Sequence, residues 1–128
     1  MTHGTFATAL NCMDGRAQEV VVNLVKKKTK VDFVDMITEP GVDKILSLGK
    51  NKKLVDWIKN KINISVEKHG SRFIAIVGHY DCAGNPVDEK THKKQIKKAV
   101  EKISNWYKGK KVEVAGLWLD EKFRGNWI

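Results

Sequence analysis

The chain has 128 residues, 41% of them hydrophobic, which fits a single domain with one core. No apolar run approaches the roughly 20 residues that a membrane-spanning helix needs. The first residues also lack the basic and apolar segments of a signal peptide, so we expect a cytoplasmic protein with no membrane partner. The formal net charge is +9. We attribute it to lysine-rich solvated helix faces and expect no nucleic-acid partner, because no recognised nucleic-acid-binding motif accompanies the charge.

Short apolar runs alternate with segments of helical character along the chain. Strands are predicted at 5–10, 31–37, 72–78 and 111–119, with a short edge strand within 123–128. Helices are predicted at 17–28, 51–68 and 90–108, with a short helical turn at 42–48. Gly70 stands where a left-handed cap would end the second long helix.

This alternation predicts an α/β fold in which residues 1–128 form one domain. The expected sheet is mostly parallel, has four to five strands, and carries helices on both faces. The simplest strand order is 2-1-3-4. In that order the first and third strands are neighbours, and the helices that follow them lie on opposite faces. Open α/β sheets bind their ligands at this position, beyond the carboxyl ends of the strands.

Both cysteines follow predicted strands that meet at this position. Cys12 comes directly after the first strand, and His79 and Cys82 come directly after the third. Zinc prefers tetrahedral nitrogen and sulfur ligands, and a catalytic zinc keeps one of its four positions open. We therefore predict a catalytic Zn²⁺ site with Cys12, His79 and Cys82 as its ligands. We find no obvious fourth cysteine or histidine that would make the site structural.

Asp14 and Arg16 follow Cys12 in the same turn and are spaced to form a charge-assisted pair. We predict catalytic roles for both: Arg16 keeps Asp14 ionised, and Asp14 accepts a hydrogen bond from the zinc-bound water. Alternatively, Asp14 occupies the fourth zinc position in a closed resting form.

Each of these residues also has a purely structural interpretation. The two cysteines could be small buried side chains or a redox pair. Taken singly, His79 would be a hydrogen-bonded structural histidine and Asp14 a helix cap. We interpret Asp81 as a surface turn residue rather than a partner of a ligand. The metal site is favoured because all five residues converge on one crevice.

Other histidines and the tryptophans are assigned by their position in the predicted elements. We expect three histidines at the surface: His3, His69 and His92. We expect the tryptophans mostly in the core, with some of them on a dimer face: Trp57, Trp106, Trp118 and Trp127.

The segment Cys12-Met13-Asp14-Gly15-Arg16 resembles the Cys-x-Asp-x-Arg motif of β-class carbonic anhydrases, and Gly78-His79-Tyr80-Asp81-Cys82 resembles their His-x-x-Cys motif. The resemblance extends over about residues 5–119. It implies a zinc lyase in which zinc-bound hydroxide hydrates carbon dioxide reversibly to bicarbonate. It also implies that Asp14 and Arg16 orient the nucleophile, and that the protein is a homodimer or a higher homo-oligomer.

The chain departs from this family pattern at two places. The loop after the second strand reads Thr38-Glu39-Pro40-Gly41 instead of an Asn-Ala-Gly-like sequence, and Glu39 could bring negative charge near the site. Ala83 separates Cys82 from Gly84, where the family has glycine directly after the cysteine. Two alternatives therefore stay open. The same site could hydrolyse carbon disulfide or carbonyl sulfide, or the chain could be a non-catalytic zinc module whose basic surface binds nucleic acid.

Overall fold

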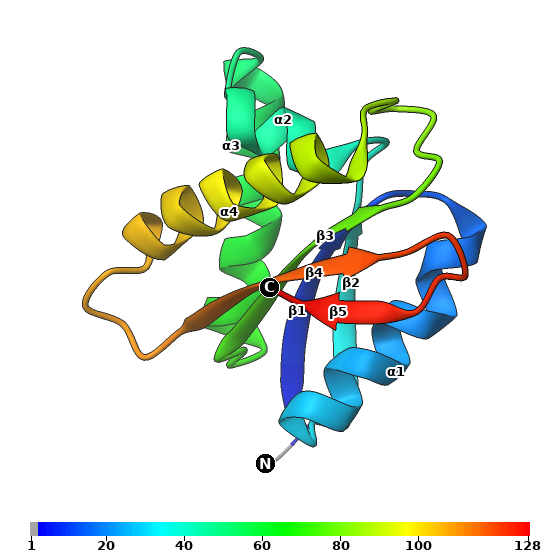
Figure 1. The fold of residues 1–128 in the computed structure, drawn as a ribbon. Helices are drawn as coiled ribbons and strands as arrows, with labels where there is room; N and C mark the ends of the chain where they lie inside the picture. Colours follow the sequence, from blue (N-terminus) through cyan, green and yellow to red (C-terminus); the bar gives the residue numbers. More distant parts are fainter. Residues whose placement is uncertain (1–2) are drawn as a thin grey trace.

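The computed structural model describes residues 3–128, which fold around one five-stranded sheet (Figure 1). Its strands are β1 (Phe6–Asn11), β2 (Phe33–Thr38), β3 (Phe73–His79), β4 (Glu113–Leu119) and β5 (Gly125–Trp127). The strand order is β2-β1-β3-β4-β5, which confirms the predicted order 2-1-3-4. The first four strands are parallel, and β5 pairs antiparallel with β4 at the edge.

The central strand is β3, which corresponds to the most apolar run of the sequence. All seven of its residues are buried, because β1 and β4 flank it and helices cover both of its faces. Strands buried on both faces typically read as continuous apolar runs. The position of β3 places its last residue, His79, beside the carboxyl end of β1.

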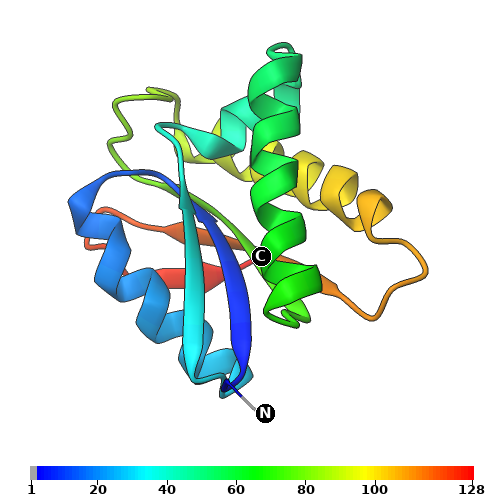
Figure 2. The ribbon, with the colours of Figure 1, turned by 180° about the vertical axis from the view of Figure 1, so that it is seen from behind.

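Helices cover the two faces unequally, as Figures 1 and 2 show from opposite sides. One face carries α1 (Gln18–Thr29), whose Val21 and Val25 are fully buried. The other face carries α2 (Val42–Leu48), α3 (Lys52–Asn63) and α4 (Glu89–Trp106). Its core contains buried residues from all three helices and from β3: Leu46, Ile58, Ile62, Ile74, Ile76, Ala99 and Ile103. None of the helices in residues 3–128 combines the length and apolarity that a membrane crossing requires.

The predicted helix 51–68 forms, but its last turn is wound differently from the rest. α3 ends at Asn63, and a π-helical turn (Ile64–Lys68) continues the chain. Ser65 on this turn is buried; its hydroxyl donates to Asp35 Oδ2 at 2.6 Å and bonds Thr8 Oγ1 at 2.6 Å. The turn thereby joins β1 and β2 through polar contacts that helical periodicity does not reveal. Gly70 follows with a φ of +72°, the left-handed conformation predicted for the cap.

The four tryptophans differ in their burial. Trp118 is buried, and Trp106 and Trp127 are half-buried. Trp57 lies outside the core and is 56% exposed on α3, which the expectation of a mostly buried set with some surface members allows. The apolar stripe of α3 is narrow, and Ile58 and Ile62 fill it without Trp57.

Candidate metal centre

The parallel pairing of β1 and β3 brings the two cysteine-bearing turns together. Cys12 is the first residue after β1, His79 is the last residue of β3, and Cys82 lies in the turn that follows. All three side chains are at most 5% exposed. Side chains that are 70 residues apart in sequence thus meet at the predicted crevice.

The three side chains are close enough to share one ion. Within residues 3–128, Cys12, His79 and Cys82 form a group whose ligand atoms all lie within 4.8 Å of one another. The Cys12 and Cys82 Sγ atoms are 3.9 Å apart. Two sulfurs bound to a tetrahedral zinc at about 2.3 Å each would be separated by about 3.8 Å. The spacing of the sulfurs therefore fits zinc without rearrangement.

The His79 ring presents a free ligand atom to this group. Its Nδ1 lies 2.7 Å from the carbonyl oxygen of Tyr80, and because a carbonyl only accepts, Nδ1 carries the hydrogen. This assigns the lone pair to Nε2, which is buried and has no hydrogen-bond partner among the described residues. An unpartnered buried nitrogen is costly. A backbone carbonyl that fixes the tautomer is the usual arrangement behind a metal-binding histidine.

Burial affects the protonation of the Cys82 thiol. It raises the pKa of Cys82 to about 11, with a further contribution from the neighbouring Cys12. The backbone N–H groups of Gly84 and Asn85 oppose this increase in the pKa. Coordination to a divalent cation deprotonates a thiol outright, so metal binding at this site would release protons.

Arg16 holds Asp14 beside the cluster. The guanidinium donates to Asp14 Oδ2 from Nη2 at 2.7 Å and to Oδ1 from Nε at 3.1 Å, and the Arg16 backbone N–H donates to Oδ1 at 2.9 Å. These hydrogen bonds lower the pKa of Asp14 to about 2. Asp14 is therefore both the cap of the short 3-10 turn Gly15–Ala17 and an ionised partner of Arg16. A move of Asp14 into a fourth ligand position would break this pair, which favours the interpretation of Asp14 as a hydrogen-bond acceptor.

Arg16 also reaches the turn between His79 and Cys82. Its Nη1 donates to Asp81 Oδ2 at 3.3 Å, its Nη2 donates to the Asp81 carbonyl at 3.2 Å, and its guanidinium lies 4.8 Å from the centre of the Phe123 ring. Asp81 is 70% exposed, as expected of a surface turn residue, yet it has a definite partner. Arg16 thus connects the two turns that carry the candidate ligands.

The loop after β2 differs from the sequence-based expectation in its charge. Glu39 does not add an uncompensated charge, because its Oε2 lies 3.4 Å from Lys61 Nζ on α3. The loop also packs against the ligand turn through glycine: a Cβ on Gly84 would lie 2.6 Å from the carbonyl carbon of Pro40. The insertion of Ala83 therefore still leaves a glycine where the two loops touch.

One of the three histidines assigned to the surface is misplaced. His3 is exposed, and His69 is partly exposed with its Nδ1 2.7 Å from Asp35 Oδ2. The assignment is wrong for His92, which is 1% exposed and bonds the equally buried Asp43. A signal was available, since His92 stands four residues before Ile96 and extends the buried stripe of α4. Sequence reasoning missed Asp43 altogether.

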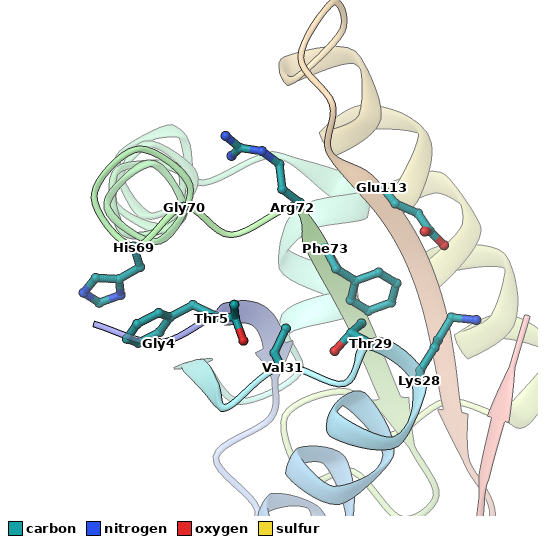
Figure 3. A pocket seen from close by; sticks show the side chains of 11 residues that line it. Gly4, Thr5, Lys28, Thr29, Val31, His69, Gly70, Arg72, Phe73 and Glu113 are labelled. Atoms are coloured by element: carbon teal, nitrogen blue, oxygen red, sulfur yellow. The ribbon is translucent and has the colours of Figure 1, made fainter. Parts of the chain in front are cut away.

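Cavities large enough for small molecules lie at both ends of the strands. A cavity of about 450 Å³ adjoins Cys82; its lining includes Tyr80, Val87 and Trp118 and four acidic residues: Asp81, Asp88, Glu89 and Glu121. Another cavity, of about 510 Å³, lies at the other end of the strands, where β1 and β3 begin (Figure 3). No predicted site residue lines the second cavity. The first cavity touches the metal cluster at Cys82, and a third cavity, of about 430 Å³, lies along α1 and is lined in part by Arg16.

Comparisons with known proteins identify the family of the chain and proteins of similar fold. A family model described as "Putative carbonic anhydrase" matches residues 2–128. No curated protein sequence matches the chain. Among solved structures, a carbonic anhydrase from Streptococcus mutans superposes with a TM-score of 0.55 at 14% identity, covering 94% of this chain and 80% of that one. A carbonic anhydrase from Glaciozyma antarctica gives a TM-score of 0.46 at 14% identity, covering 88% and 75% of the respective chains.

Proposed function

The chain belongs to the carbonic anhydrase family, and on that premise we propose that it is a zinc enzyme that hydrates carbon dioxide reversibly to bicarbonate. The observation that carries the proposal is the buried donor set of Cys12, His79 and Cys82. Its two sulfurs have the separation that zinc requires, and its imidazole nitrogen lacks any other partner among the described residues. Three protein ligands leave one of four tetrahedral positions open, which is the composition of a catalytic zinc site.

When bound, zinc supplies a Lewis acid that lowers the pKa of water and makes hydroxide available near neutral pH. The protein's own residues then orient the reactants. Asp14, which Arg16 keeps ionised, accepts a hydrogen bond from the attacking water. This hydrogen bond orients the water so that its free lone pair points away from the carboxylate. Because Arg16 also contacts Asp81, the acceptor keeps a fixed position relative to the His79–Cys82 turn.

The cavity beside Cys82 suits a neutral substrate better than an anionic one. Trp118, Val87 and Pro86 supply apolar surface for carbon dioxide. Of its four acidic residues, Asp81 is paired with Arg16 and Glu89 with Lys93. The negative charge that would disfavour bicarbonate therefore comes mainly from Asp88 and Glu121.

We further propose that the protein forms a homodimer with its interface beside the site. Three large apolar or aromatic side chains next to the candidate ligands are exposed: Met13 at 64%, Tyr80 at 50% and Val87 at 39%. A second copy of the chain would cover these side chains and close the cavity. Sedimentation that gives a monomer at micromolar concentration would contradict this assembly.

Elemental analysis combined with a stopped-flow hydration assay tests the proposed function. We expect one zinc per chain and catalysed hydration of carbon dioxide from neutral to alkaline pH. A zinc-loaded protein that leaves the uncatalysed rate unchanged would refute the carbonic anhydrase activity. Carbonyl sulfide and carbon disulfide, assayed in parallel, would show whether the same site serves another substrate.

A further inference from the structure

A buried carboxylate–imidazole pair lies behind the turn that carries two of the candidate ligands. Asp43 on α2 and His92 on α4 are each 1% exposed, and His92 Nδ1 lies 2.6 Å from Asp43 Oδ2. The other oxygen, Oδ1, accepts from the Asn85 side-chain amide at 3.1 Å and from the Lys44 backbone N–H at 3.0 Å. Burying such polar groups is costly even when they are paired, and an apolar pair of similar volume is often at least as stable. Fold stability alone is therefore a weak reason for this pair.

The pair contacts both ends of the ligand turn. At the first end, Asp43 lies against the residue before His79: a Cβ on Gly78 would come within 2.7 Å of Asp43 Oδ2. At the other end, the Asn85 side chain donates to Asp43 and, at 2.7 Å, to Gln95 Oε1. The backbone N–H of Asn85 donates to the Cys82 carbonyl at 3.2 Å. One buried carboxylate thus fixes the positions of the segments that enter and leave the turn.

The turn itself needs such support. Asp81, directly before Cys82, has a φ of +58°, a left-handed conformation that is uncommon outside glycine, although aspartate adopts it more readily than most residues. Strained backbone of this kind persists only where the surroundings hold it in place. On the outer side the Asp81 contacts are with Arg16, and on the inner side the turn is anchored through Asn85 to Asp43.

We propose that Asp43, His92 and Asn85 are positioning residues that hold the His79–Cys82 turn in its metal-binding conformation before a metal ion arrives. This inference rests on the metal site of the proposed function and concerns its affinity. A turn that is already ordered loses less conformational entropy when it binds. Substituting groups that support a metal ligand typically weakens metal binding roughly tenfold to a hundredfold.

Zinc affinity and fold stability, measured on the same variants, test the proposal. Metal-free protein is titrated with zinc against a chromophoric chelator, and its unfolding free energy is measured in urea. We expect Asn85→Ser to bind zinc roughly tenfold to a hundredfold more weakly than the wild type. The matched control is Val25→Ala, which removes buried volume under α1 on the opposite face of the sheet. It should be less stable yet keep an affinity within about twofold of the wild type.

A double variant separates positioning from folding. Asp43→Leu combined with His92→Phe replaces the pair with apolar side chains, so the chain should fold while the Asn85 amide loses Asp43 and keeps only Gln95 as an acceptor. We expect weaker zinc binding and an altered visible spectrum of the cobalt-substituted protein. Wild-type affinity and spectrum in both Asn85→Ser and the double variant would overturn this inference and leave the proposed function intact. A wild type that binds no zinc would overturn both the positioning inference and the proposed function. If the variants bind zinc as weakly as expected but the wild type does not hydrate carbon dioxide, the positioning role is supported and the proposed activity is overturned.

Discussion

Arg16 Nη2 lies 2.7 Å from Asp14 Oδ2, and the same guanidinium reaches the Asp81 carbonyl at 3.2 Å. Two turns that are far apart in sequence are therefore joined by one cation as well as by the candidate metal site. The arrangement separates two roles that substitutions can distinguish. Cys12, His79 and Cys82 would hold the ion, and the Asp14–Arg16 pair would orient what the ion activates.

Asp14→Asn should preserve zinc binding and lose activity. The amide keeps the size of the side chain, but one of its two polar ends becomes a donor and its negative charge is gone. We expect one zinc per chain and a decrease in kcat/KM of roughly a hundredfold or more, the usual range for a positioned proton acceptor. Elemental analysis and stopped-flow hydration measure the two quantities on one sample. Loss of zinc in this variant would instead indicate that Asp14 is a ligand.

Cys12→Ser should abolish zinc binding while the fold remains. A hydroxyl is a much poorer zinc ligand than a thiolate, and only His79 and Cys82 would be left. Zinc content after dialysis should fall from one per chain to near zero, and hydration should fall with it. Far-ultraviolet circular dichroism serves as the control, since serine occupies nearly the same volume as cysteine. Stoichiometric zinc in this variant would exclude Cys12 from the site.

The sequence was sufficient to predict the order of the first four strands and the convergence of the two ligand turns. Both follow from local signals, because apolar runs mark strands and parallel neighbours end at the same edge of a sheet. The roles of the ligands stay predictions. The burial of His92 was open to prediction from its spacing to Ile96, but its pairing was not, because its partner Asp43 lies 49 residues away on another helix. The π-helical winding of residues 64–68 was not predicted for a similar reason, since Ser65 bonds residues of β1 and β2 that lie far away in sequence.

Gly84→Ala should destabilise the protein through a clash between loops. The added Cβ would lie 2.6 Å from the Pro40 carbonyl carbon and 2.8 Å from the Gly41 nitrogen, and these backbone atoms cannot rotate away. We expect a loss of about 1–3 kcal/mol in the free energy of unfolding, measured in urea, as for other overpacked sites. Gly15→Ala is the matched control, because, apart from its chain neighbours and the backbone of its own helical turn, no atom of residues 3–128 lies within 4 Å of the position that the added methyl group would take. Equal stabilities for the two variants would contradict the tight contact between the loops.

Ionisation of Tyr107 should make the protein less stable above about pH 10. Its side chain is buried at the end of α4 and donates to Asn63 Oδ1 at 2.5 Å, and burial raises its pKa from 10.0 to about 12. The folded state thus holds the phenolic proton more tightly than the unfolded chain does. This contribution is complete below about pH 10 and is lost as the pH rises towards 12; linkage gives a loss of about 1.4 kcal/mol by about pH 11. Tyr107→Phe cannot titrate at this position, so urea unfolding at about pH 9 and about pH 11 should show a smaller decrease for the variant. Parallel decreases in the two proteins would show that Tyr107 keeps an ordinary pKa.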